Sequence, residues 1–151
     1  MQKRPTYLVA TDGSAGGKEA LREAIELARA SHAMLSIVYV RPAPLPMFGD
    51  PLYQRALTEA LASARTIVNE AAAEAAGAAV TTQVDILEGD PSERIIELGA
   101  ARDADLIVVG SRGRNRVTST VLGSVSDAVS QKADRPVLVV RPHHPAVKRA
   151  A

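Results

Sequence analysis

Five short apolar runs alternate along this chain with segments of helical periodicity, and this alternation limits the possible folds more than any other feature. The runs are Tyr7–Ala10, Met34–Val40, Val80–Leu87, Asp105–Gly110 and Pro136–Arg141. Strands that are apolar on both faces fit a parallel sheet covered by helices on both sides. The connections between parallel strands of one sheet are right-handed. We therefore expect an α/β fold with a single-domain, open, doubly wound, five-stranded parallel sheet.

The segments between the runs carry helix signals. We expect a helix from Ser14 to about Ser31 and a second helix over Tyr53–Ala76, with Gly77 as the glycine that follows the helix end. The second helix has an apolar stripe that we interpret as core, made of Leu57, Leu61, Ala64, Val68, Ala71 and Ala75. The loop 41–52, with four prolines, is expected to be neither helix nor central strand.

Two further helices are expected in the second half of the chain. Asp90, Pro91 and Glu93 form a strong helix start, and this helix should end near Arg102. A short helix should begin at Ser124.

Composition excludes several classes of protein. The 151 residues include 18 Lys and Arg against 17 Asp and Glu, and this balance argues against a general binder of nucleic acid or anionic membranes. The absence of cysteine excludes disulfides, zinc knuckles and thiol nucleophiles. No apolar stretch approaches about 18 residues, and the N-terminus does not resemble a signal peptide. We therefore expect a cytoplasmic protein with one domain over residues 1–142 and a loose tail over residues 143–151.

Ligands of open parallel sheets bind beyond the carboxyl ends of the strands, so the loops after the first and fourth runs are the candidate sites. The first of these loops carries Asp12, whose carboxylate could hold a ribose hydroxyl, a metal ion or an amine. A turn made by Asp12 and a helix cap made by Ser14 explain the same residues without a ligand. The loop matches neither the P-loop nor the dinucleotide fingerprint.

The loop after the fourth run is more specific. Gly110 and Gly113 are followed, after nine residues, by Gly123 and Ser124, where a helix begins. Glycines let backbone amides approach an anion closely, and Gly123 and Ser124 would present N–H groups at a helix N-terminus. Three arginines and no acidic residue lie within 111–126. The alternative interpretation is a flexible loop with solvated arginines, but such a loop would require neither of the two glycine pairs.

On these residues the chain resembles the universal stress protein family, in particular its ATP-binding branch. The family motif G-x2-G-x9-G-[S/T] is matched by Gly110, Gly113, Gly123 and Ser124, and the resemblance runs over about residues 4–142. It implies the strand order 3-2-1-4-5 and ATP, with Mg²⁺, as the ligand. The nine-residue spacer departs from the family, because it contains Thr118, Ser119 and Thr120 in place of a more apolar stretch.

The resemblance also implies roles for individual residues. Asp12 would meet the nucleotide and, weakly, Mg²⁺, and the backbone of Val40 would read the adenine edge. The nucleotide-binding residues implied are Ala10, Thr11, Asp12, Val40, Gly110, Arg112, Gly113, Gly123, Ser124 and Val125.

Other residues leave their alternatives open. Arg41 and the prolines after it cover either an adenine pocket or only the sheet edge, and Phe48 and Tyr53 fit base stacking as well as core packing. His32, His143 and His144 have no partners at metal-ligand spacing and are expected to be solvated.

The function expected is that of an ATP-binding regulatory protein of the stress response, with slow or no ATP turnover. The alternatives are a nucleotide-independent module that docks an unknown partner protein, and a slow ATPase or autophosphorylating enzyme. A homodimer is expected through the last strand, whose central residues are all apolar: Val137, Leu138, Val139 and Val140. Family members commonly dimerise through this strand.

Overall fold

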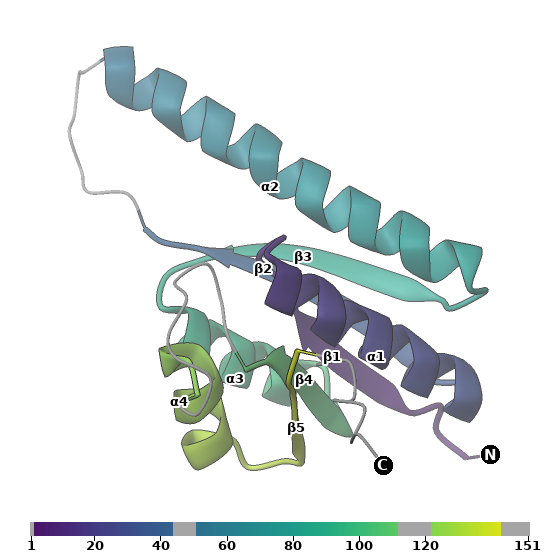
Figure 1. The fold of residues 1–151 in the computed structure, drawn as a ribbon. Coiled ribbons are helices and arrows are strands. Elements are labelled where there is room, and N and C mark those ends of the chain that lie inside the picture. The colour runs from purple at the N-terminus through teal and green to yellow at the C-terminus, as the bar shows by residue number, and fades with distance from the viewer. Residues whose placement is uncertain (1, 44–50, 112–121, 143–151) are drawn as a thin grey trace, which may run out of the picture.

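The computed structural model describes residues 2–43, 51–111 and 122–142. Its elements are β1 (Thr6–Ala10), α1 (Ala15–Ser31), β2 (Met34–Arg41), α2 (Pro51–Gly77), β3 (Thr82–Glu88), α3 (Pro91–Ala101), β4 (Leu106–Gly110), α4 (Ser124–Lys132) and β5 (Val137–Val140). The strands form one parallel sheet in the order β3-β2-β1-β4-β5 (Figure 1). The predicted fold class and strand order are confirmed.

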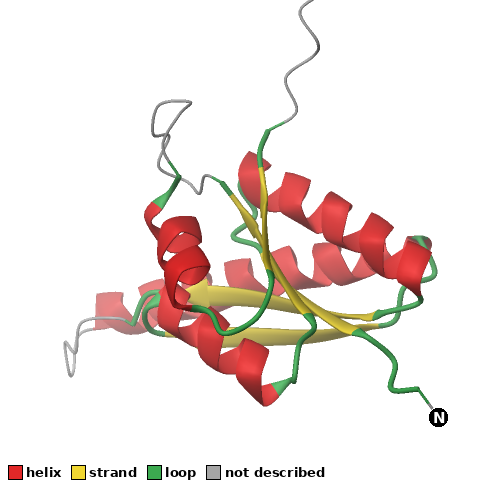
Figure 2. Ribbon diagram, turned by 90° about the horizontal axis from the view of Figure 1, so that it is seen from below, coloured by secondary structure: helices red, strands yellow, loops and turns green. Residues whose placement is uncertain are grey.

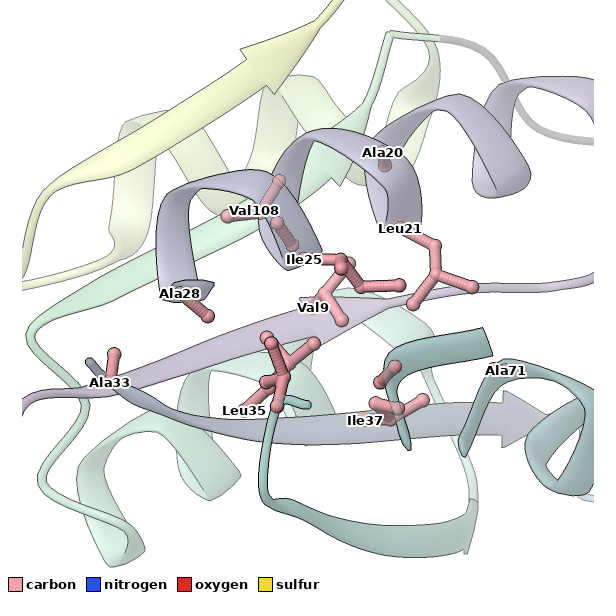
Figure 3. Packing of buried hydrophobic residues seen from close by; sticks show 13 residues of the cluster. Val9, Ala20, Leu21, Ile25, Ala28, Ala33, Leu35, Ile37, Ala71 and Val108 are labelled. Carbon is pink, nitrogen blue, oxygen red and sulfur yellow. The ribbon is translucent and has the colours of Figure 1, made fainter. Parts of the chain in front are cut away.

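Alternate residues of the central strands supply two separate cores. Val9, Leu35 and Ile37 point to the face covered by α1 and α2, where they pack under Leu21 and Ile25 (Figure 3). On the opposite face a second cluster joins the sheet to α3 and α4, and its members include Leu8, Val38, Ile95, Ile107, Val109 and Val129. The sheet is therefore the middle of three layers (Figure 2), which explains why its central strands are apolar on both faces.

Helix α2 packs on the sheet over only part of its length. Ala64, Val68, Ala71 and Ala75 are its buried residues, whereas Leu57 and Leu61 are only half-buried. The helix leans away from the sheet toward its N-terminal end (Figure 1), where Leu52 is 71% exposed. A helix of 27 residues is longer than the eight-residue strand beside it, roughly 40 Å against 26 Å. The interpretation of the whole stripe as core is thus correct only for the C-terminal half.

The end of α2 also differs from the expectation. Gly77 is the last helical residue, and the left-handed position is taken by Ala79, with φ of 59°. Ala79 N–H donates to the Ala76 carbonyl at 3.0 Å and Val80 N–H donates to the Ala75 carbonyl at 3.0 Å, which is the Schellman pattern. Val80 is buried, and because it must point into the core, the residue before it, Ala79, takes the left-handed conformation.

The predicted position of β5 at one edge of the sheet is confirmed. The tail 143–151 lies outside the described residues, as does most of the proline-rich loop. Among the helices that the structure describes, none combines the length and apolar character that a membrane crossing requires.

Candidate functional site

A cavity of about 490 Å³ opens at the carboxyl ends of β1, β2 and β4. Helix α1, which follows β1, lies on one face of the sheet, whereas α3 and α4, which precede and follow β4 in the sequence, lie on the other face. The direction of the strand order therefore reverses between β1 and β4. This is the place at which open α/β sheets bind ligands. Eight of the predicted residues line the cavity: Ala10, Thr11, Asp12, Val40, Gly110, Gly123, Ser124 and Val125. The predicted contacts Arg112 and Gly113 lie outside the described residues.

The cavity has further lining residues that the sequence analysis did not propose. They are Gly17, Val38, Tyr39, Pro91, Ile95, Val109 and Ser126. Pro42, the first proline after Arg41, also lines the cavity, as one of the two alternatives for that segment predicts. The sequence signal for Pro91 was present, because the residues around it mark a helix start. Its place in one cavity with the ends of β1, β2 and β4 follows only once strand order is known.

Three helices begin at this cavity, and they differ in what caps them. The Ser14 hydroxyl caps α1 by accepting a hydrogen bond from Gly17 N–H at 3.1 Å. The Asp90 carboxylate caps α3 by accepting from Glu93 N–H at 3.0 Å. Within the described part of the chain, no side chain caps α4, which begins after Gly123. A helix N-terminus carries partial positive charge, and among the described residues α4 is the one of these three helices that has no side-chain cap at this end.

The geometry of the α4 terminus identifies the open amides. Gly123 N–H donates to the Ser111 carbonyl at 2.7 Å, and the first bond of the helix runs from Asp127 N–H to the Gly123 carbonyl at 2.9 Å. The expectation that Gly123 offers its own N–H to a ligand is therefore wrong. The residues at the first helical positions, Ser124, Val125 and Ser126, line the cavity instead, and the amides at these positions have no partner within the helix.

Asp12 is the acidic residue among the cavity-lining residues that the structure describes. Its Oδ1 accepts hydrogen bonds from Ser14 N–H at 2.9 Å and from the Ser14 hydroxyl. The predicted turn at Asp12 and the predicted helix cap at Ser14 are therefore confirmed. Asp12 also lines the cavity, so the turn and a ligand-binding role are compatible.

The α3 terminus is already neutralised by its own carboxylate. A hydrogen bond from the Ser92 hydroxyl, together with one from Glu93 N–H, holds the pKa of Asp90 below its usual value. Asp90 therefore remains ionised at neutral pH and occupies the place that an anionic ligand would take at α3.

The described residues contain no group of three or more His, Cys, Asp or Glu side chains that could hold a metal ion by themselves. Mg²⁺ is often held by one carboxylate together with substrate phosphates. Asp12 alone is consistent with that mode of binding, and with a ligand that brings its own phosphates.

Sheet order, cavity and helix starts together define a doubly wound α/β protein with a cavity at its switch point. Residues 5–141 match the model of the universal stress protein family, and the chain belongs to this family.

Two relatives show how far the similarity extends. The stress response protein NhaX of Bacillus subtilis is 35% identical, over 89% of this chain and 96% of its own length. A universal stress protein of Thermus aquaticus is 37% identical, over 90% of this chain and 98% of its own.

Solved structures agree with the sequence relatives. Universal stress protein UspA from Lactobacillus plantarum superposes with a TM-score of 0.82 at 27% identity, covering 93% of this chain and all of the other. A universal stress protein solved in complex with cAMP has a TM-score of 0.67 at 28% identity, covering 93% of this chain and 98% of the other.

Proposed function

We propose that this chain binds ATP at the cavity, with phosphates at the N-terminus of α4, and acts as a nucleotide-responsive regulator in the stress response. The observation that carries the proposal is the α4 terminus, which lies in the cavity and has no side-chain cap from the described residues, while α1 and α3 are capped. A nucleotide complex of a related universal stress protein supports it. A cytoplasmic location and a regulatory partner protein remain predictions from the sequence.

The base would lie against the end of β2. Thr11 N–H donates to the Val38 carbonyl at 3.0 Å, so the backbone groups of Val38 face β1. Backbone groups alternate in direction along a strand, and those of Val40 therefore face the same side, beyond the point where β1 has ended. One N–H and one carbonyl spaced in this way can pair with the donor and acceptor on an adenine edge.

The ribose and phosphates would occupy the space between Asp12 and α4. Asp12 would bind a ribose hydroxyl or Mg²⁺ held by the phosphates. Gly110 would allow close approach, and the Ser124 and Val125 amides would donate to phosphate oxygens. Arg112 and Gly113 are proposed as further phosphate contacts.

Binding is tested by thermal unfolding with Mg-ATP. A ligand at 100 times its dissociation constant stabilises the folded state by about 2.7 kcal/mol. For a chain of this length the melting temperature should rise by roughly 5–10 °C. A melting temperature unchanged up to millimolar ATP would contradict the proposal.

A paired substitution tests the position of the phosphates. Ser124→Pro removes one backbone N–H at the first helical position, where proline is tolerated, and Gly123 already has the extended ψ of 158° that suits a residue before proline. Ser124→Ala removes only the hydroxyl. We expect the proline variant to fold with α4 intact and lose most of the ATP-induced shift, and the alanine variant to keep more of it.

We propose slow turnover or none, below about one ATP per minute. Hydrolysis requires a group that orients the attacking water, and Asp12, the acidic residue of the described lining, already accepts two hydrogen bonds from Ser14. Labelled ATP would detect both hydrolysis and phosphorylation of Thr118, Ser119 or Thr120. Several turnovers per second would place the protein among the enzymes.

We also propose a homodimer through β5. Leu138 and Val140 face α1, Val137 and Val139 face α4, and all four are only half-buried at the sheet edge. A second copy related by a two-fold axis could cover them. Light scattering should give twice 15.9 kDa, Val139→Lys should halve the mass, and a wild-type monomer at about 100 μM would contradict the dimer.

A further inference from the structure

The turn that carries Asp12 is held between two helices. Gly13 has a φ of +77°, and a Cβ atom built on it would lie 3.1 Å from both Cγ1 and Cδ1 of Ile67 in α2. On the other side, a Cβ atom built on Gly17 in α1 would lie 2.8 Å from Asp12 Oδ1 and 3.1 Å from Asp12 N. The turn therefore lies close to both the first residues of α1 and a side chain of α2.

Hydrogen bonds within this turn join its residues to one another. Asp12 Oδ1 accepts from Ser14, and Gly13 N–H donates to the Thr11 hydroxyl at 3.4 Å, so these bonds make the turn one unit. A displacement of the unit would carry the carboxylate with it. Two hydrogen bonds hold the ends of the turn, from Thr11 N–H to the Val38 carbonyl of β2 and from Gly17 N–H of α1 to the Ser14 hydroxyl. Between these ends, the packing of Ile67 against Gly13 opposes a displacement toward α2.

Ile67 differs from its neighbour in what it packs against. Val68 is only 3% exposed and belongs to the buried stripe that fastens α2 to the sheet. Ile67 is half-buried and reaches the β1–α1 turn. Of these two neighbouring residues, Val68 packs α2 on the sheet and Ile67 packs against the turn.

We propose that Ile67 is a positioning residue of the nucleotide site, acting through Gly13 on the Asp12 carboxylate. This inference rests on the proposed ATP binding at the same cavity. It makes ATP affinity depend on the packing of α2, a helix that contributes none of the described cavity-lining residues. By linkage, bound ATP must in turn stabilise the packing of α2 on the turn.

The test compares Ile67→Ala with Val68→Ala in the full chain, measuring ATP affinity by calorimetry and stability by urea unfolding. Val68→Ala leaves a cavity in a fully buried site, so its urea midpoint should fall further than that of Ile67→Ala. For the loss of ATP affinity, the order of the two variants should be reversed. Ile67→Ala should weaken binding about five- to tenfold, whereas Val68→Ala should stay within about twofold of wild type. Ile67→Val, which keeps Cγ1, should recover most of the affinity.

The outcomes separate this inference from the function on which it rests. If wild type does not bind ATP, the proposed function fails, and amide NMR shifts of Asp12 and Gly13 in the free variants then decide the positioning role. Shifts in Ile67→Ala that are absent from Val68→Ala support the role, and equal shifts overturn it. If wild type binds ATP and Ile67→Ala binds it equally well, only the inference is overturned. The same follows if affinity falls in proportion to lost stability in both variants.

Discussion

The sheet has two cavities of nearly equal volume at opposite ends, about 490 Å³ at the carboxyl ends of the strands and about 480 Å³ beside the amino ends. Judged by residue type alone, the amino-end cavity would be the better anion site, since Arg4, Arg29 and His32 line it. Both of its arginines are already engaged. Arg4 donates to the carbonyls of His32 and Ala33, and Arg29 pairs with Glu26.

Helix direction strengthens the contrast. The amino-end cavity is lined by the last turns of α1 and α2, whose carbonyls carry partial negative charge. The carboxyl-end cavity is lined by first turns, and α4 has amides without a side-chain cap. As candidate anion sites, the two cavities therefore differ in the backbone N–H donors at the carboxyl end, which no described side chain caps, more than in their cationic side chains.

The largest effect is expected from giving α4 the cap that α3 has. Gly123 has an extended conformation that any residue adopts, so Gly123→Asp should place a carboxylate over the open amides. The free protein should become more stable by about 0.5–1 kcal/mol. ATP should bind at least about tenfold more weakly, because the carboxylate takes the place of a phosphate and repels it.

Gly123→Asn is the matched control for charge. It caps the helix without a negative charge and should weaken ATP binding less than Gly123→Asp. If Gly123→Asp gains stability and still binds ATP with wild-type affinity in calorimetry, the phosphates do not lie at α4.

A second pair of substitutions sets the carboxyl-end site against the far end of α2. Alanine normally stabilises a helix relative to glycine by roughly 0.5–1 kcal/mol. At Gly17 its Cβ would lie 2.8 Å from Asp12 Oδ1 and 2.9 Å from the Thr11 hydroxyl, whereas at Gly77 nothing lies within 4 Å. Gly17→Ala should therefore lose several-fold in ATP affinity with no gain in melting temperature, and Gly77→Ala should gain stability with unchanged affinity. Equal behaviour of the two variants would show that the Asp12 turn tolerates displacement.

The smallest effect concerns the amino-end cavity. Arg4→Ala removes donors to the His32 and Ala33 carbonyls and to the Thr81 hydroxyl. Because Arg4 is exposed and water can replace it, stability should fall by only about 1 kcal/mol. ATP affinity should not change. A loss of ATP binding in this variant, measured by calorimetry, would show that the nucleotide belongs to the amino-end cavity instead.

The sequence predicted much of this arrangement because its signals are local. Apolar periodicity and turn residues indicated every strand and helix, and the glycines and Ser124 pointed to the end of the sheet where the larger cavity lies. The errors arose where long-range packing decides. Buried Val80 moves the left-handed residue from Gly77 to Ala79, and the length of α2 leaves Leu57 only half-buried.

Other parts of the site could not be predicted because they depend on strand order or on contacts between distant elements. Pro91 lines the cavity because α3 packs on the same face of the sheet as Val38 of β2 and Val109 of β4. The contact between Ile67 and Gly13 joins positions 54 residues apart in the sequence, and no periodicity indicates it.

Amide NMR of the ¹⁵N-labelled protein during titration with Mg-ATP tests the central claim most directly, because it reports on both ends of the sheet at once. The largest shifts should occur at Thr11, Asp12, Val40, Ser124 and Val125, with little change at Arg4, His32 and Ala79. Shifts concentrated at Arg4, His32 and Ala79, or no shifts at Ser124 and Val125 while ATP binds, would contradict the assignment of the anion site to the open N-terminus of α4.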